Sequence, residues 1–130
     1  MKKNFFIIFF FIFLTYILPN ESNAYSSDPK QFISEVVDKA KKILVETNSQ
    51  EFKTEKLSEI ALETVDIKGI GYYTLGNYRT KLSDEQKEEY STLFEKYFLK
   101  SFTSRLTDYS DPKIDVLSAE VLNPKYTIVK

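Results

Sequence analysis

The side chains that could perform chemistry in this chain are carboxylates, lysine, serine, threonine and tyrosine. None of the 130 residues is Cys or His, which excludes disulfides, thiol or imidazole catalysis, and metal sites built from thiolate or imidazole ligands. Asp66 could act as a base beside Tyr72 or Tyr73 as proton donor, the pair that an acid–base enzyme would need. The sequence gives no geometry for such a pair, so we expect neither a catalytic residue nor a metal site.

Glycines and basic residues around position 75 raise a second chemical possibility, phosphate binding. The three glycines of the chain, Gly69, Gly71 and Gly76, fall within eight residues. Their spacing matches neither a dinucleotide-binding fingerprint nor a P-loop. Arg79 and Lys81 could pair with a phosphate group, although charged loop side chains are usually just solvated. The formal net charge of -1 provides no basic field, so we expect no nucleic-acid partner.

The first 24 residues have the three-part pattern of a secretory signal peptide. A basic start precedes an uncharged stretch of 14 residues from 5 to 18, and Ser22 and Ala24 place small residues at positions -3 and -1 of a cleavage site. As a helix this stretch would span about 21 Å, short of the roughly 30 Å hydrocarbon core of a membrane, so we favour cleavage over anchoring. The mature chain is then 25–130, enough for one domain.

Helix-start signals and apolar periodicity predict four helices, at about 29–47, 53–65, 67–76 and 83–109. Asp28 before Pro29 is a typical first cap, and Ser83 with Gln86 is a typical capping box. Apolar residues in the last helix recur every three or four positions and predict one wide stripe along it. The stripe comprises Tyr90, Leu93, Phe94, Tyr97, Phe98, Phe102, Leu106 and Tyr109.

After the last predicted helix the pattern is typical of strands, at about 113–121 and 125–130, with a turn at Asn123-Pro124 between them. The apolar alternation changes phase near Leu117, which indicates a bulge or a doubly buried pair. We therefore expect an α+β fold whose helices pack on a curved antiparallel sheet that is incomplete, with an unpaired edge.

The order of these features resembles the MlaC family, the toluene-tolerance proteins that bind phospholipid in the periplasm. The resemblance is carried by Leu75-Gly76-Asn77-Tyr78-Arg79, by Leu82-Ser83-x-x-Gln86, and by the aromatic run from Tyr90 to Tyr109. It extends more loosely from Ile33 to Val129, over most of the mature chain. It implies an NTF2-like α+β fold in which helices and a curved sheet enclose the acyl chains of a phospholipid.

The resemblance also implies a function and partners. Such proteins carry phospholipid as cargo, without a cofactor or an enzymatic step. They exchange it with an inner-membrane ABC transporter complex that contains MCE domains and with an outer-membrane lipoprotein–porin complex, which maintains the lipid asymmetry of the outer membrane. Family members continue with further strands and a C-terminal helix, so we expect a C-terminally truncated member at 25–130.

Apolar and aromatic side chains are the lipid-binding residues that the resemblance implies. Two acyl chains hold about thirty methylenes, whose exposure to water would cost about 24 kcal/mol, so a carrier must enclose them. Ordinary core packing is the alternative role for the aromatic residues. The expected lipid-binding residues are Leu75, Tyr78, Phe94, Tyr97, Phe98, Phe102, Val116 and Ile128, and Tyr72, Tyr73 and Arg79 are expected at the cavity rim.

Two further functional classes stay open on the sequence alone. An exported adaptor or chaperone would bind peptides or partner proteins through an exposed strand edge and an aromatic face. An NTF2-like enzyme would use Asp66 with Tyr72 or Tyr73. Analysis of the purified chain would separate these classes. Bound phospholipid supports the carrier, a co-purified partner protein supports the adaptor, and the absence of both leaves the enzyme open.

Overall fold

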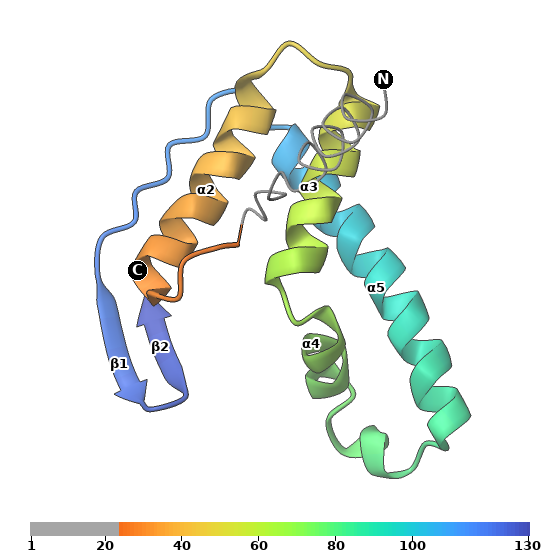
Figure 1. The fold of residues 1–130 in the computed structure, drawn as a ribbon. Helices are drawn as coiled ribbons and strands as arrows, with labels where there is room; N and C mark the ends of the chain where they lie inside the picture. Colours follow the sequence, from red (N-terminus) through yellow and green to blue (C-terminus); the bar gives the residue numbers. More distant parts are fainter. Residues whose placement is uncertain (1–23) are drawn as a thin grey trace, which may run out of the picture.

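The computed structural model describes residues 24–130, which form helices followed by one β-hairpin (Figure 1). Nearly all of the predicted signal peptide lies outside these residues. The elements are α2 (Pro29–Val45), α3 (Gln50–Thr64), α4 (Ile67–Thr74), the 3-10 helix η1 (Gly76–Thr80), α5 (Asp84–Thr107), β1 (Ala119–Asn123) and β2 (Tyr126–Val129). The two strands pair antiparallel, which confirms the predicted α+β class with a small, incomplete sheet.

Within residues 24–130, each of the four α-helices begins at a side chain that accepts a hydrogen bond from a backbone N–H three residues later. Asp28 caps α2 and Ser83 caps α5 in a complete capping box, as predicted. Ser49 caps α3, so this helix begins at Gln50, three residues before the predicted start. Asp66 caps α4 by accepting from the Gly69 N–H at 2.9 Å. These caps occupy N–H groups that helices leave unpaired at their first turn.

Helix ends and the connection between α4 and α5 differ in detail from the sequence-based expectation. The α2 and α5 helices end at Val45 and Thr107, two residues before the predicted ends. The predicted third helix ends at Thr74, and Gly76 follows with φ 53°, a left-handed conformation that glycine adopts without strain. The chain then forms η1, a short element that the sequence reading did not predict.

The predicted strand at 113–121 is wrong over its first half. The strand β1 begins at Ala119, and residues 113–118 form an irregular chain that leads to it. Only the end of this chain joins the hairpin ladder, where the Leu117 N–H donates to the Lys130 carbonyl at 2.6 Å. The register irregularity lies between Val121 and Asn123, later than the phase change near Leu117. A strand needs a second segment with which its backbone can form hydrogen bonds, and the alternation of apolar residues alone does not supply one.

The helices form one layer in which α3 lies between α2 and α5 (Figure 1). The α4 helix also packs on α5, and β2 packs on α2 at the opposite side of the molecule. Among the described residues, the buried apolar side chains are Leu44, Leu57, Ala61 and Ile67. This core is small, and the aromatic stripe on α5 is only partly covered: Leu93, Tyr97 and Tyr109 are exposed, and its other members are half-buried.

Candidate functional site

An apolar groove lies between η1 and the first half of α5. It consists of two adjoining hollows of about 350 and 470 Å³ that share Tyr90 and Leu93. Each hollow has the size of a typical small-molecule site. The residues that line the groove are Thr74, Leu75, Tyr78, Leu82, Gln86, Glu89, Tyr90, Leu93, Phe94 and Tyr97.

A row of four aromatic rings on α5 forms the floor of the groove and continues beyond it. Consecutive ring centroids lie 5.9, 6.2 and 5.8 Å apart, from Tyr90 through Phe94 and Phe98 to Phe102. Residues four positions apart in a helix share one face, which explains the row. All four rings are half-buried, so each keeps part of its surface available for a ligand.

Helix α4 positions the ring of Phe94. Gly71 is buried against it, and a Cβ atom on Gly71 would lie only 2.9 Å from Phe94 Cδ1. The glycine therefore allows α4 to approach α5 closely at this point. Nearby, the Thr74 hydroxyl donates to the Gly71 carbonyl at 2.7 Å and lies 2.7 Å from the Tyr90 hydroxyl. Because the one Thr74 proton is used, Tyr90 is the donor in the second bond.

An ion pair between exposed residues also joins α4 to α5. Lys68 Nζ lies 3.1 Å from Glu88 Oε2. The hydrogen bond to Glu88 raises the pKa of Lys68 above its ordinary value, and the negative charge of Glu88 adds to this effect. Both groups are exposed, so water and salt screen the pair. It orients α4 and contributes little to stability.

Large apolar side chains along the groove are exposed to solvent. Leu93, Tyr97 and Tyr78 are 59%, 69% and 68% exposed. Single exposed apolar residues are normal, but several side by side in a hollow indicate an interaction or ligand surface. The polar groups in the lining are the side chains of Thr74, Gln86 and Glu89 and the tyrosine hydroxyls. Lys81 Nζ lies nearby, 5.6 Å from the centroid of the Tyr78 ring. The groove therefore suits a ligand that is mainly apolar.

Half of the expected lipid-binding residues come together in this groove. Leu75, Tyr78, Phe94 and Tyr97 line it, and Phe98 and Phe102 extend its ring row along α5. The structure does not bring the remaining two to the groove. Ile128 lies on β2, which packs on α2 (Figure 1), and Val116 lies in the segment that leads to the hairpin; neither lines the groove.

The three expected rim residues lie on α4 and η1 and are not part of the groove lining. Tyr72 is half-buried, with Lys68 Nζ 5.8 Å from its ring centroid. Tyr73 is 81% exposed, and Arg79 is exposed on η1. The sequence reading left Leu82, Tyr90 and Leu93 out of the site. Tyr90 and Leu93 already belonged to the helical stripe, so the stripe was the signal that could have identified them.

Of the residues considered for acid–base chemistry, Asp66 has a structural role. Asp66 uses its carboxylate to cap α4, and in the described part of the chain it makes no hydrogen bond to Tyr72 or Tyr73. Residues 24–130 hold no group of three acidic side chains that could bind a metal ion. In residues 24–130 the carboxylate of Asp66 therefore serves the helix cap and is not hydrogen-bonded to either tyrosine.

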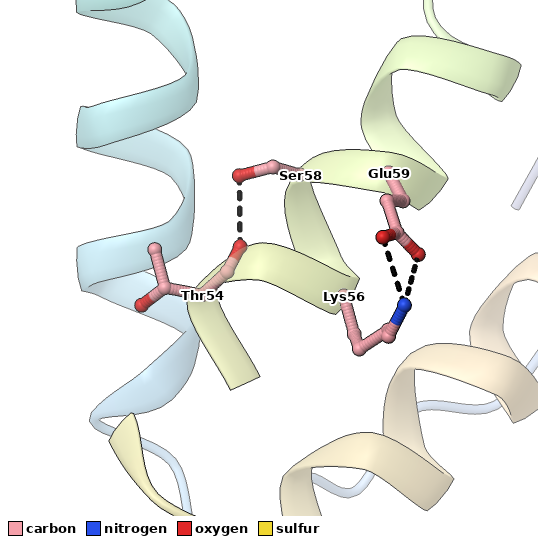
Figure 2. Close-up of polar contacts among 4 residues, drawn as sticks. All are labelled: Thr54, Lys56, Ser58 and Glu59. Atoms are coloured by element: carbon pink, nitrogen blue, oxygen red, sulfur yellow. Dashed lines mark hydrogen bonds and ion pairs between the residues drawn. The ribbon is translucent and has the colours of Figure 1, made fainter. Parts of the chain in front are cut away.

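Two other hollows flank α3, and their linings mix apolar side chains with charged or hydroxyl side chains. One of about 360 Å³ lies between α3 and α5 beside hydroxyl side chains such as Ser58, which donates to the Thr54 carbonyl at 2.8 Å. Another of about 340 Å³ lies between α3 and α2, where Lys56 pairs with Glu59 at 2.7 Å. Figure 2 shows the two pairs on opposite sides of α3. Charged side chains make up more than half of the lining beside α2, whereas the groove on α5 is lined mainly by apolar and aromatic side chains, so it is the stronger candidate site for an apolar ligand.

Comparison with known proteins shows the family of the chain. In the part of the chain that the structure describes, no helix is both long and apolar enough to cross a membrane. None of the curated proteins and none of the solved structures gives a match. The family model described as MlaC protein matches residues 30–130, a span that runs from α2 to the hairpin and includes the whole groove. The chain therefore belongs to the MlaC family.

Proposed function

We propose that this protein is a periplasmic phospholipid carrier and that an acyl chain binds in the groove along α5. The proposal rests on one observation above the others: a chain of the MlaC family carries an apolar groove in which Tyr78, Leu93 and Tyr97 are exposed beside the ring row of α5. Family membership supports phospholipid binding as the general activity. The apolar lining of the groove supports it as the proposed site.

The energetics of the groove favour a long apolar ligand. Each methylene removed from water contributes about 0.8 kcal/mol, so covering ten of them contributes about 8 kcal/mol before ordering costs. A chain lying over Phe94 would also cover Leu93 and Tyr97, which are exposed in the absence of a ligand. Tyrosines suit the edge of such a site because the ring is apolar and the hydroxyl can stay in water.

The η1 end of the groove suits the phosphate of the lipid. Lys81 lies beside the Tyr78 ring, and Arg79 is exposed on the same element. Cationic donors of this kind form charge-assisted hydrogen bonds with phosphate oxygens. The acyl chain of the phospholipid would therefore lie along α5, and its headgroup would lie near η1.

The same proposal gives the protein a place in an Mla-type lipid transport system. It would exchange phospholipid with an inner-membrane ABC transporter complex that contains MCE domains and with an outer-membrane lipoprotein–porin complex. Phospholipid is cargo in this role, and no chemical step is required. Membership of the MlaC family is the support for these partners.

Lipid analysis of the exported protein tests the proposal. The full chain would be expressed in a Gram-negative host, purified from the periplasm without detergent, and extracted for mass spectrometry of bound phospholipid. Leu93→Ser removes apolar contact from the groove, at a cost of about 1.4 kcal/mol or tenfold in affinity. Leu62→Ser is the matched control, because Leu62 is 52% exposed on α3 and outside the groove lining.

We expect stoichiometric phospholipid in the wild type and in Leu62→Ser, and a clear loss in Leu93→Ser. A wild-type protein without lipid would contradict the proposal. Equal lipid content in the two variants would place the lipid elsewhere in the fold. Another protein that co-purifies stoichiometrically in place of lipid would support the adaptor function instead.

A further inference from the structure

The first described residues fold back against one face of α2. The Tyr25 ring meets the Phe32 ring edge-on, with centroids 5.4 Å apart. Lys39 Nζ lies 3.8 Å from the centroid of the Tyr25 ring. The Ser26 N–H donates to Glu35 Oε2 at 2.9 Å. Since Phe32, Glu35 and Lys39 recur at helical spacing, a single face of α2 anchors this segment by packing, cation–π and hydrogen-bonding contacts.

The anchored segment begins where the predicted signal peptide ends. Ser22 and Ala24 supply the small residues at positions -3 and -1 that the leader pattern requires. Ala24 is exposed, whereas Tyr25 is half-buried against α2. The bond between them therefore separates an exposed residue, where a peptidase can reach the backbone, from the first residue that the fold holds.

We propose that the chain is cleaved between Ala24 and Tyr25 and that the new α-ammonium group of Tyr25 forms an ion pair with Glu35. A peptidase that recognises small residues at -3 and -1 hydrolyses the bond with one water molecule. Ala24 leaves with a carboxylate, and Tyr25 keeps an amine that is mostly protonated at neutral pH. Adjacent residues lie about 3.8 Å apart, so this ammonium lies within about 7 Å of the carboxylate that already binds Ser26.

The charged groups around the new terminus indicate that Glu35 is its partner. Gln31 Nε2 donates to Glu35 Oε1 at 3.1 Å, so the carboxylate is oriented while its other oxygen binds the Ser26 N–H. Directly after β2, the other element packed on α2, Lys130 is paired with Glu120 at 3.3 Å. The charged groups that share the α2–α3 hollow with Tyr25 are Lys39, Lys42, Glu46, Lys56, Glu59 and Glu63, whose formal charges cancel.

Cleavage would in this way hold the mature N-terminus against α2. Before cleavage, the backbone nitrogen of Tyr25 is a neutral amide beside a carboxylate. After cleavage it is a cation at the same place, and opposite charges a few ångströms apart stabilise each other. Tyr25 would then stay against α2 as one wall of the hollow of about 340 Å³ between α2 and α3.

Mass spectrometry and amine reactivity test this inference on the full chain exported to the periplasm. We expect the intact mass to correspond to residues 25–130. With a limiting acylating reagent at pH 7, we expect the Tyr25 α-amine to react about three- to tenfold more slowly in the wild type than in Glu35→Gln, because the ion pair keeps it protonated. Asp38→Asn makes the same charge change at an exposed position of α2 and should leave the rate within about twofold.

Each outcome supports or overturns one part of the inference. A different N-terminal residue would overturn the cleavage site, and equal rates in wild type and Glu35→Gln would overturn the ion pair. If Glu35→Gln does not fold, the wild type is compared at about 50 mM and 1 M salt, where screening should speed the reaction; an unchanged rate would overturn the ion pair. The inference rests on the proposed export, and lipid analysis of the same sample reports separately on lipid carriage.

Discussion

Replacing Gly71 with alanine is expected to destabilise the protein, although alanine is the better helix former. A Cβ atom at this buried position would lie 2.9 Å from Cδ1 and 3.1 Å from Cγ of Phe94. Carbon atoms pack best at about 3.5–4.0 Å, so the contact is repulsive. The ring has little freedom to move, because Tyr90 and Phe98 lie on either side of it with centroids 5.9 and 6.2 Å away.

Two effects of opposite sign decide the magnitude. Alanine in a helix interior is favoured over glycine by about 1 kcal/mol. An extra methyl group in a filled contact costs about 1–3 kcal/mol. We therefore expect Gly71→Ala to lower the free energy of unfolding by about 1 kcal/mol. In a Phe94→Leu background the ring is gone, the helix preference remains, and the same substitution should stabilise by up to about 1 kcal/mol.

Urea denaturation of wild type, both single variants and the double variant, followed by far-UV circular dichroism, measures this change of sign. The coupling free energy between the two positions should be about 1–3 kcal/mol. The slopes of unfolding free energy against urea should agree, so that midpoints report stability. If Gly71→Ala stabilised both backgrounds equally, the inferred close packing of α4 on Phe94 would be refuted.

Three other substitutions test the elements that support the groove. Ser83→Ala removes the side-chain oxygen of the α5 capping box and should cost about 1 kcal/mol in thermal denaturation, whereas an unchanged midpoint would show that α5 does not depend on its cap. Leu57→Ala truncates a side chain that is 1% exposed and should cost about 3 kcal/mol by urea denaturation, and a cost below about 1 kcal/mol would contradict its place in the core. Glu88 raises the pKa of Lys68 above 10.5, so the pair stabilises the fold below that pH and the effect is lost as the pH rises through the raised value. Glu88→Gln should therefore be slightly less stable than wild type at neutral pH, and the difference should disappear as the pH rises through the raised pKa of Lys68; a difference that grows with pH would contradict the sign.

Local sequence signals predicted the helices well. The caps at Asp28 and Ser83 involve residues only three positions apart, so short motifs suffice to place the starts of α2 and α5. The start of α3 was missed because Ser49 was interpreted as part of a helix break, whereas its side chain accepts from the Phe52 N–H. The connection at Gly76 was predicted as the end of a helix, but η1 was not.

Strand prediction failed where long-range pairing was required. Ile114, Asp115 and Val116 alternate as a strand does, yet among the described residues the backbone pairs with Lys130 only from Leu117 onwards. Alternation expresses the preference of one segment, whereas a ladder needs a second segment at the correct distance. For the same reason the sequence could not show that Val116 and Ile128 lie apart from the aromatic row.

The sequence by itself determined that Tyr90, Phe94, Phe98 and Phe102 share one face of α5, because helical periodicity acts within a few residues. Only the tertiary structure decided which rings receive a covering element. Gly71 brings α4 onto Phe94, while Tyr97 stays 69% exposed over a groove. Packing between helices depends on how residues distant in the chain meet, and a single missing Cβ atom controls that approach here.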